Sequence, residues 1–181
     1  MITENISLTA DEENILKSTV GEKFFIVASA DDSNFSTDFN WTIYFSFETF
    51  CIKIEREDIV AKFFDEFEDG GKPKVEKISR NEIVKKSTKT INRVVKGVNI
   101  ISVTIEFTNY KITYPKAIIF EFEDCNLVIE KIWIFSLAGF KIFLESDDAE
   151  NFGLTDELQF WYDPDEDKEK PKFTQEIKSL K

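Results

Sequence analysis

IISVTIEF at residues 100–107 is the first of four short apolar runs, followed by KAIIFEFE at 116–123, LVIEKIWIF at 127–135 and KIFLES at 141–146. Polar or turn-forming residues separate the runs. Within them apolar side chains recur at every second position, and successive side chains of a β-strand point to opposite faces. The stretch therefore predicts consecutive antiparallel strands, which indicate a fold class but not a function.

The run at 127–135 is apolar on both of its faces. Leu127 and Ile129 fall on one face, and Val128 falls on the other. A strand of this kind needs cover on both sides, from a helix or from a second sheet. We expect it to be the central strand of its sheet, with Phe140–Glu145 as the next strand.

The N-terminal part of the chain predicts a helix and then a strand. Thr9 and Glu12 have the spacing of a capping box, which favours a short helix over residues 10–20. Gly21 follows, and glycine suits the left-handed position beyond a helix end. Residues 24–28, which read FFIVA, then predict a first strand.

Residues 41–47 and 50–56 predict the clearest hairpin in the sequence. Both segments alternate between apolar and polar side chains, and only Glu48 and Thr49 lie between them. Strands this close along the chain pair through a tight turn. We expect the apolar face of this hairpin to carry five large side chains: Trp41, Phe45, Phe47, Phe50 and Ile52.

The next segments indicate helix less clearly. Within residues 58–69, Ile59, Phe63 and Phe67 recur every four residues as in an amphipathic helix, although the same segment also fits a strand. We favour a short helical or irregular segment that ends at the glycine pair of residues 70 and 71.

A second helix is predicted over residues 81–96. Ser79 and Glu82 repeat the spacing of a capping box. Ile83, Val84 and Ile91 would supply part of the apolar stripe of this helix, and Gly97 would end it.

Composition bounds the size and class of the fold. The chain has 181 residues, of which 42% are hydrophobic and 19 are phenylalanine, so it can build a sizeable core. We expect an α+β fold: a curved, mostly antiparallel sheet of about six to eight strands with one or two helices packed on it. Residues 1–162 would form a single domain, and residues 163–181 a charged, flexible tail.

The chain is acidic, with a formal net charge of −12 at pH 7. This charge disfavours attraction to nucleic acid and to anionic membranes, and it favours a basic protein partner. Many cytosolic bacterial proteins are equally acidic for solubility alone. The chain starts without a signal-peptide pattern and has no apolar run long enough to span a bilayer, so we expect it in the cytoplasm.

The residue types exclude several classes of enzyme. The sequence contains no histidine, which excludes Ser-His and Cys-His catalysis and histidine zinc sites. Cys51 and Cys125 are too few for a structural zinc site, and we expect them to be reduced thiols. No cofactor or metal is expected. Carboxylate chemistry remains, with Glu121, Glu123 and Glu130 as candidates, although the strand pattern places all three toward solvent.

A strongly acidic block near the C-terminus is the best candidate for a binding surface. It spans residues 145–167, contains no basic residue, and is interrupted by QFWY at 159–162. Aromatic side chains ringed by charge are typical of binding hot spots. The residues that we expect to contact a partner are Asp147, Asp148, Trp161, Tyr162, Asp163, Asp165, Glu166 and Asp167.

In charge and composition the chain resembles small acidic bacterial immunity proteins, which neutralise a toxin, and inhibitors that mimic the charge of a nucleic acid. No motif carries the resemblance, which implies a non-enzymatic protein-binding domain that masks a basic partner. The alternative is a carboxylate-based enzyme or small-molecule binder with its site in the concave face of the sheet. A homodimer formed through an exposed strand edge, such as Phe140–Glu145, is a further hypothesis.

Overall fold

A computed structural model of the chain describes residues 1–31, 39–63, 66–131, 134, 138–145 and 171–181, without the side chains of Phe63 and Glu145. These residues form one α-helix, one 3₁₀ helix and eleven strands. In chain order they are β1 (Ile2–Asn5), α1 (Ala10–Lys17), β2 (Lys23–Ser29), β3 (Thr42–Phe47), β4 (Cys51–Phe63), β5 (Glu66–Ile78), η1 (Arg80–Glu82), β6 (Ser87–Val94), β7 (Gly97–Glu106), β8 (Tyr110–Glu121), β9 (Asn126–Glu130), β10 (Lys141–Glu145) and β11 (Lys172–Leu180).

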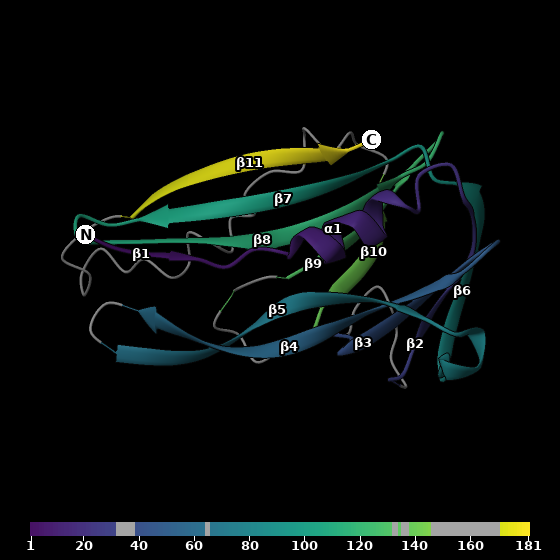
Figure 1. The fold of residues 1–181 in the computed structure, drawn as a ribbon, viewed down its shortest axis with the longest axis horizontal. Coiled ribbons are helices and arrows are strands. Elements are labelled where there is room, and N and C mark those ends of the chain that lie inside the picture. The colour runs from purple at the N-terminus through teal and green to yellow at the C-terminus, as the bar shows by residue number, and fades with distance from the viewer. Residues whose placement is uncertain (32–38, 64–65, 132–133, 135–137, 146–170) are drawn as a thin grey trace.

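The strands form two sheets rather than the single curved sheet that the sequence predicts. One sheet has the order β10-β9-β8-β7-β11, and β1 adds to β8 in parallel. The other has the order β5-β4-β3-β2-β6, with antiparallel pairing throughout. Figure 1 shows them as two layers, with β11, β7 and β8 above and β5, β4 and β3 below. The α+β, mostly antiparallel character is confirmed.

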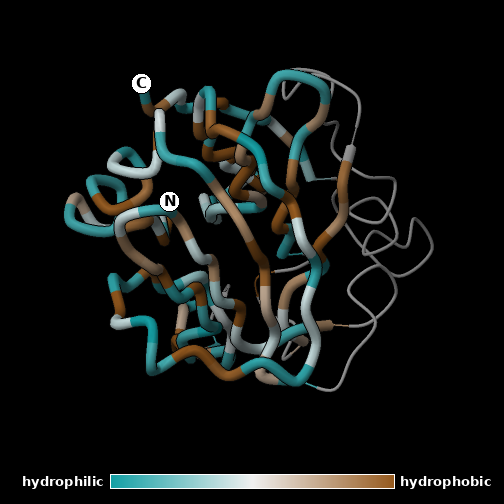
Figure 2. The backbone as a smooth tube through the Cα atoms, turned by 90° about the vertical axis from the view of Figure 1, so that its right-hand side faces the viewer, coloured by the Kyte–Doolittle hydropathy of each residue, from teal (hydrophilic) through white to brown (hydrophobic). Residues whose placement is uncertain are grey.

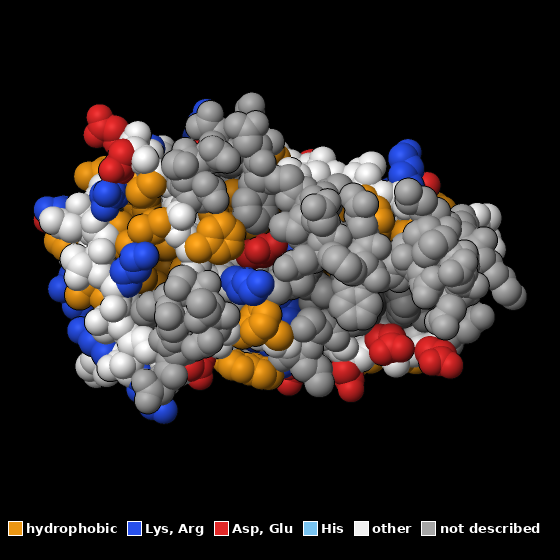
Figure 3. Space-filling model, turned by 180° about the vertical axis from the view of Figure 1, so that it is seen from behind, with side chains coloured by type: hydrophobic (Ala, Val, Ile, Leu, Met, Phe, Trp, Pro, Cys, Tyr) orange, Lys and Arg blue, Asp and Glu red, His pale blue; other side chains and the backbone are white. Residues whose placement is uncertain are grey.

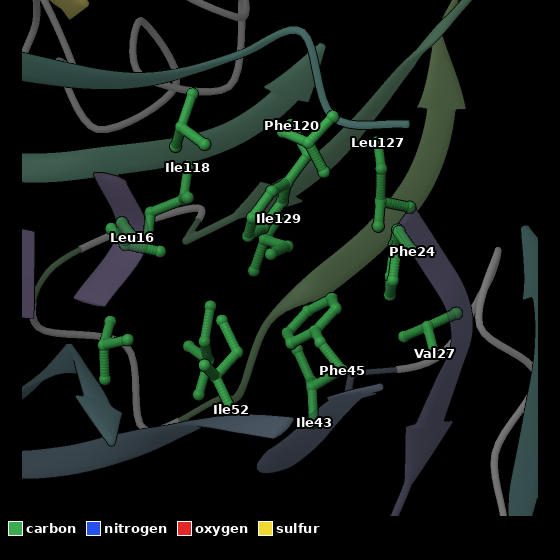
Figure 4. Packing of buried hydrophobic residues seen from close by; sticks show 14 of the residues in the cluster. Leu16, Phe24, Val27, Ile43, Phe45, Ile52, Ile118, Phe120, Leu127 and Ile129 are labelled. Atoms are coloured by element: carbon green, nitrogen blue, oxygen red, sulfur yellow. The ribbon is translucent and has the colours of Figure 1, made fainter. Parts of the chain in front are cut away.

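The main core lies where the two sheets and α1 meet. Figure 4 shows side chains from all three pointing toward one another, among them Leu16 of α1, Phe45 of β3 and Phe120 of β8. The ring of Phe24 on β2 lies 5.1 Å from that of Phe47 and 6.1 Å from that of Phe120, measured between centroids. Burying each such side chain stabilises the fold by about 1.5–3 kcal/mol. In Figure 2 hydrophobic stretches follow strands through the middle of the molecule.

β9, in the first sheet, is apolar on both faces, as the sequence indicates. Leu127 and Ile129 join the main core, whereas Val128 joins a separate buried cluster on the opposite face. Two parts of the prediction are wrong. The central position between neighbours belongs to β8, and β9 ends at Glu130. Beyond this end, the Ile134 carbonyl accepts a 2.9 Å hydrogen bond from Gly71 N of β5.

The capping box at the start of α1 is confirmed. Glu12 N donates to Thr9 Oγ1 at 3.2 Å, and Thr9 N donates to the Glu12 carboxylate at 2.7 Å. The helix ends at Lys17, earlier than predicted, and the hydroxyl of Thr19 bonds back to the Leu16 carbonyl at 2.7 Å. Gly21 has a φ of +87°, the left-handed conformation that glycine favours.

The predicted hairpin between β3 and β4 is confirmed, with Phe45 paired to Ile52. Its buried face carries Phe45, Phe47 and Ile52 as expected. Trp41 is the exception. It lies before β3, 47% of its surface is exposed, and its ring packs against the side chain of Arg56.

The helical interpretation of residues 58–69 is wrong, because the described part of this segment belongs to β4 and β5. The two strands pair without interruption from Cys51↔Ile78 to Phe63↔Glu66. The glycine pair lies inside β5 rather than ending the element. Proline is tolerated at position 73 because β5 is an edge strand.

The helix predicted over residues 81–96 is also wrong. The Ser79–Glu82 capping box is present, but it opens only the 3₁₀ turn η1. Residues 87–94 then form β6, which pairs antiparallel with β2. Thr88, Thr90 and Val94 are β-branched and suit a strand, so pairing with β2 prevails over the local helical signal.

A third correction concerns the C-terminus. Residues 172–180 fall in the predicted flexible tail, but they form β11 and pair with β7 along their whole length, from Lys172↔Glu106 to Leu180↔Val98. Phe173 and Ile177 alternate here with exposed polar residues, which is the signature of a half-buried strand.

Candidate functional site

The predicted partner-binding residues, Asp147, Asp148, Trp161, Tyr162, Asp163, Asp165, Glu166 and Asp167, all lie outside the described residues. Their role stays a prediction. Among the described residues, the best candidate surface is on the hairpin of β4 and β5.

The outer half of this hairpin extends beyond the rest of its sheet. β3 pairs with β4 only as far as Glu55, whereas β4 continues to Phe63. In Figure 1 this part runs past the end of β3 toward the side of the molecule where the N-terminus lies. The described residues therefore present a two-stranded ribbon with an accessible outer face.

One face of the ribbon combines exposed apolar side chains with carboxylates. Val60 pairs with Asp69 and Lys62 with Phe67, and paired residues of antiparallel strands share a face. Asp58 lies on the same face, two residues before Val60. Val60 is 66% exposed and Phe67 75% exposed. We call Trp41, Asp58, Val60, Phe67 and Asp69 the acidic–aromatic face.

Trp41 joins this face through Arg56. The guanidinium carbon of Arg56 lies 5.0 Å from the centre of the Trp41 ring. The same side chain forms an ion pair with Asp58 and donates to the Gly70 carbonyl at 3.2 Å. Its side chain is only 5% exposed, so these contacts hold it in place. Arg56 therefore fixes the aromatic ring beside the carboxylates.

An open hollow of about 430 Å³ lies at this point. Its walls combine the Trp41 ring, two carboxylates and apolar side chains with the guanidinium of Arg56, which already pairs with Asp58. The lining residues are Trp41, Arg56, Asp58, Ile59, Val60, Asp69 and Gly70.

The glycine pair makes this arrangement possible. A Cβ at Gly71 would overlap the side chain of Arg56, and a Cβ at Gly70 would lie 2.7 Å from the Ile134 carbonyl oxygen. Both residues lie inside a strand, where glycine marks a close approach by another part of the chain. The sequence feature that seemed to end an element thus positions Arg56.

The second face of the ribbon also carries carboxylates. Glu66 and Glu68 are exposed there, and Glu57 pairs with Lys72 at 3.0 Å. In Figure 3 acidic side chains gather along the lower right edge of the molecule, where the hairpin lies. This part of the surface therefore favours a basic partner over an acidic one.

The three carboxylate candidates from the sequence differ in burial in the structure. Glu123 is exposed and Glu121 half-buried, but the prediction that Glu130 faces solvent is wrong. Glu130 is buried and pairs with Lys116 at 2.8 Å. The cause is a β-bulge: Ile101 pairs with Ala117 and Ser102 with Pro115, which leaves Lys116 as the extra residue. Bulges redirect side chains in this way.

Lys131 lies beside this pair. It is buried, its ammonium donates to the Ala138 carbonyl, and its backbone N–H donates to the Lys116 carbonyl at 2.8 Å. Burial, and then the nearby charge of Arg56, lower the pKa of Lys131 to about 8. A perturbed pKa can mark an active site. However, the gap between Lys116, Lys131, Ile129 and Phe140 has no space for a water-sized molecule, so no substrate fits there.

A second hollow, of about 450 Å³, lies between β6 and the turn after β8. Arg93 and Asp124 form a two-pronged ion pair there, with distances of 2.7 and 2.9 Å. Their hydrogen bonds lower the pKa of Asp124 to about 2 and raise that of Arg93. The charges of the pair neutralise each other, and no aromatic residue lines the hollow, so it is the weaker candidate.

Other sites are not apparent in the described part of the chain. Cys51 and Cys125 are free thiols, as predicted. No group of three or more potential metal ligands occurs among the described residues. None of the described helices combines the length and apolar character needed to cross a membrane.

Comparisons with known proteins give no further assignment. The chain matches no protein-family model, no curated protein and no solved structure.

Proposed function

We propose that this chain is a non-enzymatic, acidic protein-binding domain that masks a basic partner, in the manner of an immunity protein or inhibitor. The supporting observation is the acidic–aromatic face of the β4–β5 hairpin. It presents Val60 and Phe67 at 66% and 75% exposure beside the carboxylates of Asp58 and Asp69, with Lys62 opposite Phe67.

The composition of this face is that of an interface hot spot. Exposed aromatic and apolar anchors supply the area that a partner can bury, and the surrounding carboxylates steer a cationic surface toward them. Isolated apolar residues on a surface need no explanation. Here Val60 and Phe67 share one face of the ribbon, and Trp41 and Val60 line a hollow that has two carboxylates in its wall.

The alternative, a carboxylate-based enzyme or small-molecule binder inside the fold, has less support. Such a site needs an ionisable group in contact with a substrate. The buried carboxylate of Glu130 is paired with Lys116, and the space beside the pair is closed.

Capture of a partner from the native host tests the proposal. The wild-type chain is compared with a Val60→Ser/Phe67→Ser variant, which removes the anchors, and with Asp58→Asn/Asp69→Asn, which removes the carboxylates. We expect a basic protein to bind the wild type, and its Kd to rise roughly thirtyfold or more without the anchors.

Matched controls separate this face from general acidity and hydrophobicity. Val84, in the connection before β6, and Val94 of β6 are 44% and 42% exposed, so Val84→Ser/Val94→Ser removes exposed apolar side chains away from this face. Glu123→Gln/Glu176→Gln removes two exposed charges elsewhere. Neither should change capture. A partner retained equally by all variants would contradict the proposal.

The predicted C-terminal residues need a separate experiment. Neutralising Asp163, Asp165, Glu166 and Asp167 together tests the acidic block. Loss of the partner in this variant, with full retention in the hairpin variants, would assign binding to the block instead of the hairpin.

A further inference from the structure

The outer half of β4 has an open edge. Arg56 N donates to the Trp41 carbonyl at 3.0 Å, so the main-chain groups of residue 56 point away from β5. Because this direction alternates along a strand, the N–H and C=O groups of Asp58, Val60 and Lys62 point the same way. Among the described residues no strand pairs with β4 on that side beyond Glu55.

The outer edge of β5 is protected between Gly71 and Val75, in contrast. Gly71 N donates to the Ile134 carbonyl at 2.9 Å, and Val75 N donates to the Glu12 carboxylate at 3.1 Å. Pro73, between them, has no N–H to offer. Cover and proline are two of the means by which proteins prevent pairing at an edge, and charged side chains are another. Among the described residues neither cover nor proline protects Asp58–Lys62, and the two charges on this edge are of opposite sign.

The open edge is complementary to itself. Asp58, Val60 and Lys62 follow one another at alternate positions, with an acid before and a base after an apolar residue. In an antiparallel pair of two copies centred on Val60, each Asp58 lies opposite the Lys62 of the other copy. Opposite charges in facing positions stabilise a sheet, and the two exposed valine side chains bury each other.

We propose that two copies of this chain associate by adding β4 to β4 across Asp58–Lys62, which joins the two hairpins into one four-stranded sheet. The pairing is isologous, with a two-fold axis through the paired valines. Such an axis, perpendicular to the sheet, brings both acidic–aromatic faces to the same side. Phe67 and Asp69 of both copies would then lie on that side of the sheet, whereas Asp58 and Val60 enter the contact between the copies. The formation of the dimer does not depend on the proposed function.

The order of side chains favours a second copy over a basic segment of another protein. A strand rich in lysine or arginine would place a cation opposite Lys62 as well as opposite Asp58. Like charges in facing positions of a sheet are destabilising. The edge therefore selects an acid–apolar–base sequence, and this chain carries that sequence itself.

Sedimentation equilibrium of the full chain tests the proposal, with Val60→Pro and Val60→Thr as a matched pair. Proline removes an N–H that the fold does not use, as Pro73 does in β5, and it blocks the edge. Threonine keeps the N–H and the branched shape. We expect a concentration-dependent dimer for the wild type and for Val60→Thr, and a monomer for Val60→Pro. A wild type that stays monomeric would overturn the proposal.

Charge reversal tests the register without proline. Asp58→Lys and Lys62→Asp each place like charges opposite one another in the dimer, and each should weaken it about tenfold or more. The double variant Asp58→Lys/Lys62→Asp restores opposite charges and should restore dimerisation. A dimer that is unaffected by the single changes would use another surface, and the proposal would fall. Capture of a basic partner is a separate measurement, so failure here leaves the proposed function to its own test.

Discussion

At the scale of single residues, the buried pair of Lys116 and Glu130 is the strongest departure from a simple sheet. Both side chains are almost fully buried, at 1% and 6% exposure. Removing one partner from a buried ion pair leaves a charge without compensation, which typically costs about 3–5 kcal/mol. Replacing both partners by apolar residues of similar volume can cost much less.

We therefore expect Glu130→Gln to lower the free energy of unfolding by about 3–5 kcal/mol. The double variant Lys116→Met/Glu130→Leu should lose less than this single variant. Urea unfolding of the wild type and both variants measures the two differences. If the double variant is the less stable of the two, the pair itself contributes net stability and our interpretation is wrong.

Because the pKa of Lys131 is lowered in the folded chain, we expect the free energy of unfolding to depend on pH. Its pKa in the folded chain is about 8, against an ordinary value of 10.5, because burial disfavours the charged amine. Below pH 8 the amine is charged in both states, and the folded state bears the cost of desolvation. Between pH 8 and 10.5 the unfolded chain binds more protons, so this residue's contribution to stability rises with pH.

Lys131→Met removes the buried charge, so its stability relative to the wild type should be most favourable at pH 7 and should decline toward pH 10. Urea unfolding at both pH values gives the two differences. Lys89→Met, at an exposed position, controls for the loss of a lysine charge. A relative stability of Lys131→Met that is the same at both pH values would show that the amine is not perturbed.

The sequence could not place Glu130 in the interior. Alternation along β9 predicts an exposed side chain, and the partner that buries it lies on β8, displaced by a bulge. Pro115 was the available signal, because proline inside a sheet is confined to edges and bulges. The alternation of side chains describes one strand at a time, so it does not predict contacts with a neighbouring strand.

At the scale of elements, local signals were reliable where they acted alone. The capping box of Thr9 and Glu12 gave α1, and the short connection after Phe47 gave the β3–β4 hairpin. The same capping spacing at Ser79 failed, because β2 offers residues 87–94 a partner strand. Pairing with distant strands outweighs a local preference.

The hairpin site was missed for a related reason. Ile59, Phe63 and Phe67 have helical spacing, but the continuous pairing of β4 with β5 determines the outcome. From the sequence alone, the glycine pair indicates a break in the chain. In the structure, Gly70 and Gly71 allow the close approach of Ile134 and Arg56 to β5, and Pro73 lies on the protected edge of that strand. Only the positions of Ile134 and Arg56 reveal these roles.

Glu12 links a local element to a distant one. One carboxylate oxygen caps the helix at Thr9, and the other accepts the hydrogen bond from Val75 N on β5 at 3.1 Å. Glu12→Ala therefore removes the carboxylate half of the capping box and also leaves the buried N–H of Val75 without its partner, whereas Thr9→Ala removes only the hydroxyl half of the box. Thr9→Ala should cost about 1 kcal/mol. Glu12→Ala should cost about 1–3 kcal/mol more.

Urea unfolding of the two variants measures this difference. Circular dichroism shows whether each variant keeps its fold. Equal costs for Glu12→Ala and Thr9→Ala would mean that the contact with β5 adds nothing to stability.

At the scale of the whole molecule, the aromatic core decides whether the two sheets act as one unit. Phe120 of β8 lies 6.1 Å from Phe24, 5.4 Å from Phe45 and 6.2 Å from Phe47, all on the opposite sheet. Each strand pair is held by its own backbone bonds, but these rings connect one sheet to the other. The single domain that the sequence predicts depends on this contact.

Phe120→Ala tests that dependence. Truncating a buried phenylalanine typically costs about 3–5 kcal/mol. If the sheets form one cooperative unit, hydrogen exchange should accelerate by the same factor in β3 and in β8, because both are exposed in the same global opening. Val128→Ala is the control, since Val128 lies in the cluster on the far face of the first sheet and not in the core between the sheets. Acceleration confined to β7, β8 and β9 in Phe120→Ala would show that the sheets open independently, and the chain would then consist of two stacked units rather than one domain.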